Sequence, residues 1–362
     1  NMFKLNLLIL FLFSTQVFGY VSEINELTLG REFTAVAGPM ITPKTILKTI
    51  ANERGGEIYQ HRDPRKWKVK DDDGFKWSAE IDGRIFDEFV FEVQTPPLKG
   101  HQADLMLVPF NALIKSGARP YYSLGGGHIH IDIEDKYRAH PTGFSFLKHP
   151  KMMASLMNLL LTYEETLTFI FRNFRRDHTT RKLSELRQNG KTLAQILGHK
   201  LNLYLKNNGQ GCEDAVSEEL LKRHQSCIVS YLEHFARNIV PTRETDINLQ
   251  AWKGSSAKKT HGTLELRFFN APKTKTEVIL EEKLVRSIAD FAFRSNNDPV
   301  FYQPKVKPIF GENAYIVDYK LLKMHFGELL KRIGLGDLKE KYFATYFGKD
   351  FKKLMERRHP GN

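Results

Sequence analysis

Hydrophobic and polar positions alternate with period two over the first third of the chain, which predicts strands. Strand patterns cover residues 27–33, 66–70, 75–81, 89–95 and 127–133, and the pattern returns at 263–269. Asp82-Gly83 is typical of a type I′ hairpin turn between two of these strands. Helices are expected over 43–53, with Thr42 as the N-cap, and over 105–116.

The period lengthens to that of a helix between about 150 and 240. Apolar residues recur on one helical face from residue 151 onward, and the segments 193–205 and 215–239 have the same pattern. A further helix is expected over 277–293, and a basic, aromatic helical tail begins at Asp318. These patterns predict an α+β fold in one domain, residues 20–362, with a helical insertion at about 150–240 and a helical C-terminal extension at about 318–362.

Composition is that of a globular protein rather than a disordered chain or a disulfide scaffold. The 362 residues are 41% hydrophobic and 12% aromatic, which is enough apolar material for a core. Lys and Arg number 54 against 42 Asp and Glu, so the formal net charge is +12. This excess favours anionic partners but does not choose among nucleotides, acidic metabolites and anionic polymers.

Residues 1–19 have the pattern of a secretory signal peptide. Lys4 precedes the apolar run 5–13, and Val17-Phe18-Gly19 resembles a cleavage site, so cleavage is expected after Gly19. The run is shorter than the roughly 20 apolar residues of a membrane-spanning helix. We therefore expect an exported protein, periplasmic or secreted, without a stable membrane anchor.

The chain has two cysteines, Cys212 and Cys227. An exported protein can oxidise such a pair. However, one continuous helix over 215–239 would place Cys227 about twelve helical residues along, beyond the reach of a disulfide. We expect no disulfide between them.

Four strands carry polar side chains on one face and apolar side chains on the other, because successive residues of a strand point to opposite faces. The polar faces hold Glu32 and Thr34, Glu92 and Gln94, His128, His130 and Asp132, and Thr263, Glu265 and Arg267. In one shared sheet these faces would form a cup. Carboxylates ligate hard divalent cations and arginine pairs with phosphate, so such a cup suits a metal and a phosphate. For any one strand alone, a solvated sheet surface is the alternative.

Five segments of these strands form an ordered set of motifs. They are Gly30-Arg31-Glu32-Phe33, Trp67-Lys68-Val69-Lys70-Asp71-Asp72, Phe91-Glu92-Val93-Gln94-Thr95-Pro96-Pro97-Leu98, Gly127-His128-Ile129-His130-Ile131 and Gly262-Thr263-Leu264-Glu265-Leu266-Arg267-Phe268. In this order they resemble the motifs of the amidoligase family, within the glutamine-synthetase-like carboxylate–amine ligase superfamily. Tyr163-Glu164 and Arg175-Arg176 stand where that family has a helical Tyr-Glu and a downstream Arg. The resemblance covers about residues 26–293.

The resemblance implies a curved antiparallel sheet with a polar concave catalytic face and helices on the other face. It also implies that ATP and Mg²⁺ bind on the concave face, and that a carboxylate is joined to an amine through an acyl-phosphate. The implied metal ligands are Glu32, Glu92, Glu265 and His128, the implied catalytic residues are Glu265, Arg267, His128 and His130, and the implied ATP contacts are Arg267 and His130. Lys258 and Lys259, in the loop just before the last of these strands, are further candidates for ATP phosphate contacts, with a solvated basic loop as the alternative.

The expected substrate is a small molecule or peptide with a carboxylate and an amine, such as an amino acid or a cell-wall peptide. We expect no nucleic-acid partner, and assembly into oligomers is compatible with the superfamily. Thr34 stands where the opening strand of the family usually has a second acid, which predicts a weaker or missing second metal. Because ATP is scarce outside the cytoplasm, action after delivery into another cell and loss of ligase activity are both open.

Two alternatives belong to other functional classes. The first is an exported zinc-dependent hydrolase, because His128-x-His130-x-Asp132 resembles the HxHxD motif of metallo-β-lactamase-like enzymes. The second is a catalytically inactive basic binding protein for nucleic acid or an anionic cell-wall polymer. Its support is the C-terminal tail, in which Lys320, Lys323, Lys331, Arg332, Lys339, Lys341, Lys349, Lys352 and Lys353 alternate with Phe326, Tyr342 and Phe347.

Overall fold

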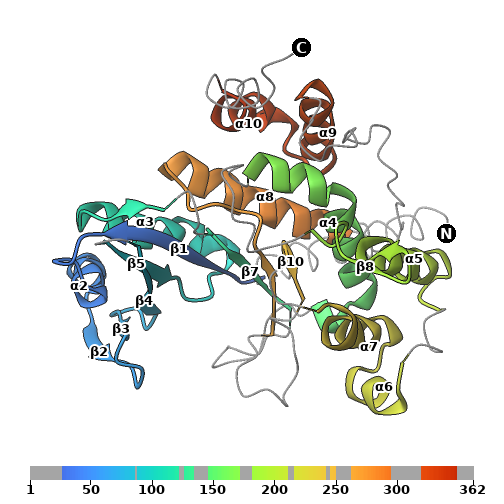
Figure 1. Cartoon of the computed structure of the whole chain (residues 1–362), viewed down its shortest axis with the longest axis horizontal. Helices are drawn as coiled ribbons and strands as arrows, with labels where there is room; N and C mark the ends of the chain where they lie inside the picture. The colour runs from blue at the N-terminus through green and yellow to red at the C-terminus, as the bar shows by residue number, and fades with distance from the viewer. Residues whose placement is uncertain are drawn as a thin grey trace, which may run out of the picture.

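The computed structural model of the chain describes residues 27–85, 88–121, 126–133, 146–171, 182–210, 216–241, 245–249, 262–294 and 319–348. These residues form an α+β fold with an antiparallel sheet, as the sequence pattern predicts (Figure 1). The proposed signal peptide, Arg175-Arg176, Cys212, and Lys258 and Lys259 lie outside the described residues.

One large sheet carries most of the described strands. Its order is β10 (Ile247–Asn248), β11 (Thr263–Leu266), β7 (Ile129–Asp132), β1 (Leu29–Ala37), β5 (Glu88–Gln94), β4 (Lys76–Ile85), β3 (Lys66–Lys70) and β2 (Glu57–Gln60). β6 (Arg119–Pro120) pairs with the second half of β1, beyond the segment that pairs with β7. Every described pairing in this sheet is antiparallel. A separate small ladder joins β8 (Arg187–Gln188) to β9 (Lys191–Thr192).

Helices cover the apolar face of the sheet in layers. The described α-helices are α2 (Pro43–Arg54), α3 (Leu107–Lys115), α4 (Pro150–Phe171), α5 (Leu193–Lys206), α6 (Glu218–His224), α7 (Cys227–His234), α8 (Lys275–Arg294), α9 (Tyr319–Arg332) and α10 (Lys339–Tyr346). Short 3₁₀ turns lie at Gly100–Met106, Phe146–Lys148 and Gly336–Leu338, and a π-helical turn at Phe235–Ile239 follows α7. α4 packs against α8, and α9 and α10 lie outside this pair (Figure 1).

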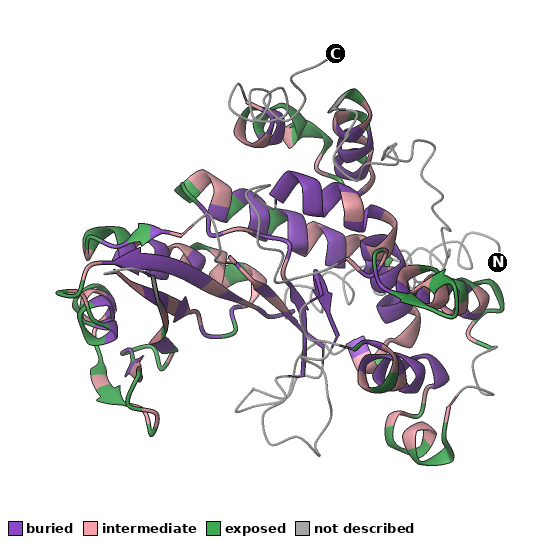
Figure 2. Ribbon diagram, viewed as in Figure 1, coloured by how far each residue is buried: buried purple, intermediate pink, exposed green. Residues whose placement is uncertain are grey.

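The alternation of each strand produces the core. Leu29 and Phe33 of β1, Phe91 and Val93 of β5, and Ile131 of β7 point toward the helices and are buried, with at most 1% of each exposed. Figure 2 shows the buried layer running through the sheet and the inner faces of α4 and α8. The opposite, polar face of the same strands is thereby fixed in position by core packing.

The start of α2 follows the predicted capping. Thr42 has extended backbone angles, and its Oγ1 accepts a hydrogen bond from the Thr45 backbone N–H at 3.1 Å. The Pro43 ring occupies the first turn, where a missing N–H costs nothing. This anchors the buried stripe of α2, made by Ile46, Leu47 and Ile50, against β3 and β4.

The predicted hairpin turn at Asp82-Gly83 is wrong. β4 continues to Ile85 and β5 begins at Glu88, so these two residues lie inside the ladder. The register shifts between Ile81 and Gly83, which makes Asp82 the extra residue of a β-bulge. A dipeptide favourable for a turn is also favourable for a bulge, since both need an irregular backbone.

The expectation of unbridged cysteines is also wrong, because Cys227 is disulfide-bonded. The helix expected over 215–239 is interrupted: α6 ends at His224, the next residue, Gln225, has a left-handed φ of 51°, and α7 begins at Cys227. Cys227 therefore stands at the first turn of a new helix rather than deep inside a long one. The break at Gln225 removes the continuous helix that would place Cys227 out of reach of a bridge.

None of the helices in the described ranges is both long and apolar enough to cross a membrane.

Candidate functional site

Strand register gathers the predicted polar residues onto one face. His130 of β7 lies opposite Glu265 of β11 on one side and opposite Gly30 of β1 on the other. Glu32 of β1 lies opposite Gln94 of β5, two residues along from Gly30. Directly opposed residues of antiparallel strands share a face, so these side chains project together. The cup that the alternation predicts is therefore present.

Glu32 is the centre of this face. His128 Nδ1 lies 3.0 Å from Glu32 Oε2, and His130 Nε2 lies 3.1 Å from Glu32 Oε1. The other ring nitrogen of His130, Nδ1, lies 3.1 Å from the Thr263 hydroxyl of β11. Each imidazole is thus held by groups from neighbouring strands. His128 also spans the gap to β11, with Nδ1 3.2 Å from Glu265 Oε1.

Glu265 is buried and held by three donors. Its Oε1 accepts a hydrogen bond from Arg267 Nη1 at 2.9 Å, besides the contact with His128, and its Oε2 accepts one from Asn248 Nδ2 of β10 at 2.6 Å. The Nε atom of Arg267 is also buried and has no hydrogen-bond partner among the described residues. Arg267 therefore keeps a donor that faces no protein acceptor within the described ranges.

Gln94 connects Glu32 with the second carboxylate of the face, Glu92. Its Nε2 donates to Glu92 Oε1 at 2.5 Å and to Glu32 Oε1 at 3.4 Å. Its Oε1 accepts hydrogen bonds from Lys66 Nζ at 3.2 Å and from the Ser78 hydroxyl at 2.9 Å. The amide orientation is set by the opposite charges at its two ends.

The carboxylates of this face differ in the direction of their pKa shifts. Burial opposes ionisation of Glu32, but the charge of His130 and hydrogen bonds from both histidines hold the pKa of Glu32 well below its usual range. Burial also opposes ionisation of Glu265, but the hydrogen bond of His128 and the charges of His130, His128 and Arg267 lower the pKa of Glu265 to about 2. Burial, together with the charge of Glu32, instead raises the pKa of Glu92 to about 8.

The pKa values of the two histidines are raised, which favours their charged form. Burial alone would lower the pKa of His128, but its hydrogen bonds to Glu265 and Glu32 raise it to about 9. The pKa of His130 is likewise raised, against burial, by the charge and the hydrogen bond of Glu32. The two imidazolium rings, with the Arg267 guanidinium, thus supply positive charge beside the buried acids.

Three of these residues have donor atoms close enough to hold one metal ion. Glu32, His130 and Glu265 each offer one ligand atom, and these atoms lie within 4.8 Å of one another. The two carboxylate oxygens suit a hard divalent cation such as Mg²⁺ or Mn²⁺, and the imidazole nitrogen also suits Zn²⁺ or Fe²⁺. His128 and Arg267, predicted for the same site, contact its carboxylates, and Glu92 is linked to it through Gln94.

Asp132 and Thr34 have different surroundings from this cluster. Asp132 Oδ2 accepts a hydrogen bond from the Thr28 hydroxyl at 2.9 Å, and Asp132 lies opposite Thr263 at the far end of β7. Thr34 lies opposite Glu92, and its hydroxyl donates to the Gly126 carbonyl at 2.9 Å. Thr34 therefore holds the glycine segment before His128 through this hydrogen bond. A second acid at this position would instead offer a metal ligand.

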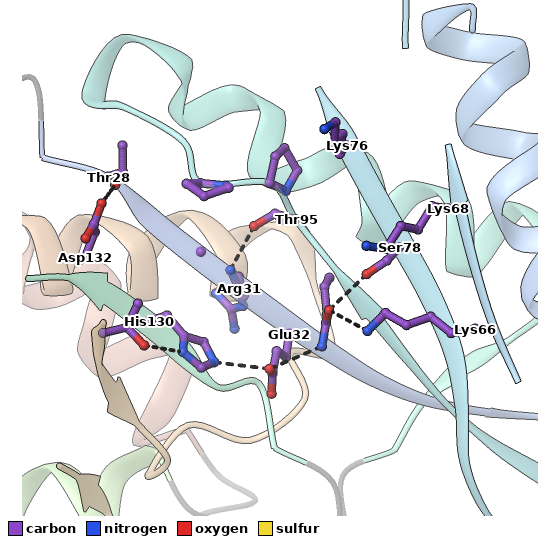
Figure 3. Close-up of a pocket in the computed structure, with 15 residues that line it drawn as sticks. Thr28, Arg31, Glu32, Lys66, Lys68, Lys76, Ser78, Thr95, His130 and Asp132 are labelled. Atoms are coloured by element: carbon purple, nitrogen blue, oxygen red, sulfur yellow. Dashed lines mark hydrogen bonds and ion pairs between the residues drawn. The ribbon is translucent and has the colours of Figure 1, made fainter. Parts of the chain in front are cut away.

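A cavity of about 470 Å³ opens on this face (Figure 3). At one end it is lined by Glu32, His130, Asp132 and Thr263, and at the other by the lysines of β3 and β4. The lysine lining is formed by Lys66, Lys68 and Lys76.

Sequence reasoning missed this lysine end and Asn248. The Lys-Trp-Lys-Val-Lys alternation of 66–70 has the same period-two signal as the acidic strands, and applying that signal there would have found the lysines. Asn248 stands in a two-residue strand with no pattern long enough to read. A scan against protein-family models and a comparison with curated proteins found no match to this chain.

Proposed function

We propose that this protein is an ATP- and Mg²⁺-dependent ligase that joins a carboxylate to an amine through an acyl-phosphate, with a glutamine-synthetase-like catalytic sheet. The observation that carries the proposal is the convergence of Glu32, His130 and Glu265 from three strands, with Glu32 and His130 lining a cavity. The order of the motifs along the chain, given above, supports the same family.

The residues present fit a divalent cation. Glu32, His130 and Glu265 would hold it, and a bound cation neutralises charge on the phosphoryl group during transfer. His128 bridges Glu32 and Glu265 and so orients both carboxylates. Arg267 is tied to Glu265 through Nη1, which leaves the rest of its guanidinium to contact a phosphate oxygen.

The zinc-hydrolase alternative has less support from the same geometry. It requires His128, His130 and Asp132 to converge, whereas Asp132 is hydrogen-bonded to Thr28 and is not part of the described cluster of metal-ligand atoms.

The basic-binding-protein alternative also loses part of its basis. Phe326, Tyr342 and Phe347 of the tail are buried, so their rings are core rather than a stacking surface. The ammonium groups of Lys323 and Lys339 lie 4.6 and 5.4 Å from the centre of the Phe343 ring, in contacts within the C-terminal layer.

Isothermal titration of the full chain with a non-hydrolysable ATP analogue, with and without Mg²⁺, tests the proposal. We expect Mg²⁺-dependent binding that is lost in Glu265→Gln, because the substitution removes a ligand charge while preserving shape. The control is Glu219→Gln, which changes an exposed glutamate of α6 far along the chain from the site strands.

Two results would contradict the ligase assignment. One is the absence of nucleotide binding at any Mg²⁺ concentration by a protein whose circular dichroism is that of a folded α+β chain. The other is tightly bound zinc in the purified protein that is retained in Glu32→Gln and lost in Asp132→Asn, which would favour the hydrolase.

A further inference from the structure

The lysine end of the cavity is a second charged region of the same sheet face. Lys66 and Lys68 alternate on β3, and Lys68 lies opposite Ser78 of β4. Lys76 precedes Ser78 by two residues and is therefore the diagonal neighbour of Lys68 on that face. All three lysines line the cavity, and Figure 3 shows their side chains on the strands beyond Glu32.

Only one of these ammonium groups is neutralised by the protein residues described. Lys66 Nζ lies 2.9 Å from Glu80 Oε1 and 3.2 Å from Gln94 Oε1. Lys68 and Lys76 have no ion pair with any residue of the described ranges. Burial, and then the charges of Lys66 and Lys76, lower the pKa of Lys68.

The two ends of the cavity belong to one connected network. Lys66 and Ser78 donate to Gln94 Oε1, and Gln94 Nε2 donates to Glu32. β3 is separated from β1 by β4 and β5, so its backbone lies roughly 14 Å from the strand of Glu32, at about 4.8 Å per strand. A ligand that spans the cavity can therefore place one group at the acidic cluster and another at the lysines.

We propose that Lys68 and Lys76, with Lys66 beside them, bind a carboxylate of the substrate other than the one that is ligated. The substrate class is thus an acidic compound with at least two carboxylates. This inference rests on the proposed function, in which the nucleotide phosphates accompany the divalent cation at Glu32, His130 and Glu265. Lysine ammonium groups bind carboxylates as point charges, which suits a flexible acidic ligand.

The experiment measures two probes on the full chain by isothermal titration: glutarate, as a simple dicarboxylate, and a non-hydrolysable ATP analogue with Mg²⁺. In the double variant Lys68→Gln/Lys76→Gln we expect glutarate affinity to fall about tenfold or more, because two charged contacts are lost. Affinity for the nucleotide analogue should change less than about twofold, since screened charges that distance away contribute little.

Lys70→Gln is the matched control. Lys70 lies directly opposite Lys76 and is exposed, as Lys76 is, but unlike Lys76 it does not line the cavity. The substitution removes one positive charge beside the subsite but outside the cavity lining, so both probes should bind the variant nearly as they bind the original chain.

The outcomes separate the two proposals. Equal loss of both probes in the double variant would assign the lysines to the nucleotide and overturn the substrate subsite, and so would unchanged glutarate binding. If the original chain binds no nucleotide but its glutarate binding depends on Lys68 and Lys76, the ligase proposal fails and the subsite stands. Glutarate binding that falls equally in Lys70→Gln would show that binding depends on the positive charge of these strands and not on contacts inside the cavity, and would overturn the subsite.

Discussion

His130 Nε2 lies 3.1 Å from Glu32 Oε1, although 98 residues separate the two along the chain. The contact exists because β7 pairs with the first half of β1, at Leu29–Arg31, while β5 continues along its other edge. It joins an imidazole to a carboxylate at the point where three strands present polar groups to one cavity. The core on the opposite face holds these strands and so fixes this contact.

Gln94→Leu is expected to destabilise the protein. The substitution removes the amide that donates to Glu32 and Glu92 and accepts from Lys66, so buried charged groups lose partners. We expect the free energy of unfolding to fall by about 1–3 kcal/mol, measured by urea denaturation. Gln60→Leu, at an exposed position of β2, is the control, and an equal loss in both variants would contradict the bridging role of Gln94.

Arg31→Met tests the buried ion pair beneath the site. The Arg31 guanidinium pairs with Glu281 of α8, and Tyr346 of α10 donates to the same carboxylate at 3.0 Å. Removing one partner leaves a buried acid uncompensated, so unfolding free energy should fall by about 3–5 kcal/mol. Glu218→Gln breaks the exposed pair with Lys222 and should cost less than about 1 kcal/mol. Similar costs for both substitutions would argue against a buried pair.

The stability of the protein should depend on pH through His325 of α9. This ring is buried, stacked on Tyr163 with 4.6 Å between ring centres, and hydrogen-bonded to Thr166. Burial lowers the pKa of His325 to about 4, against about 6.5 in an unfolded chain. The unfolded state therefore takes up a proton first as pH falls, and the contribution of His325, complete above about pH 6.5, is lost toward pH 4.

The measurement compares the original chain with His325→Gln at pH 7 and pH 5. Between these values the original should lose about 2 kcal/mol more unfolding free energy than the variant, since all other titrating groups are common to both. Comparing the pH dependence, rather than stability itself, removes the packing cost of the substitution. Parallel losses in the two proteins would show that His325 titrates alike in the folded and unfolded states.

Gly127→Ala should disturb the segment that carries His128 and leads into β7, which carries His130. A Cβ at this position would collide with the Asn270 backbone carbonyl and lie 2.9 Å from the Arg31 guanidinium. Because a backbone atom cannot move away cheaply, we expect a loss of about 1–3 kcal/mol in unfolding free energy and weakened nucleotide binding. Gly198→Ala in α5 meets nothing within 4 Å and should instead stabilise by about 0.5–1 kcal/mol. Equal melting temperatures for the two variants would contradict the close approach at Gly127.

Local chemistry alone determined much of this protein. Alternation assigned the strands and the side of each that carries Glu32, Glu92, His130 and Glu265, because successive strand residues must point to opposite faces. It also indicated an α+β chain whose helices cover the apolar side. These features need only neighbouring residues, so they can be read without knowing which strands pair.

Tertiary structure decided which groups meet. Register selected Glu32, His130 and Glu265 as the convergent donors, placed Asp132 with Thr28, and joined Lys66 of β3 to Glu32 through Gln94. It also placed Asp82 in a β-bulge instead of a turn, and it began a new helix at Cys227 instead of continuing α6. Cross-strand contacts depend on pairings between residues far apart in the chain, and a shift of one residue would send every side chain of a strand to the other face.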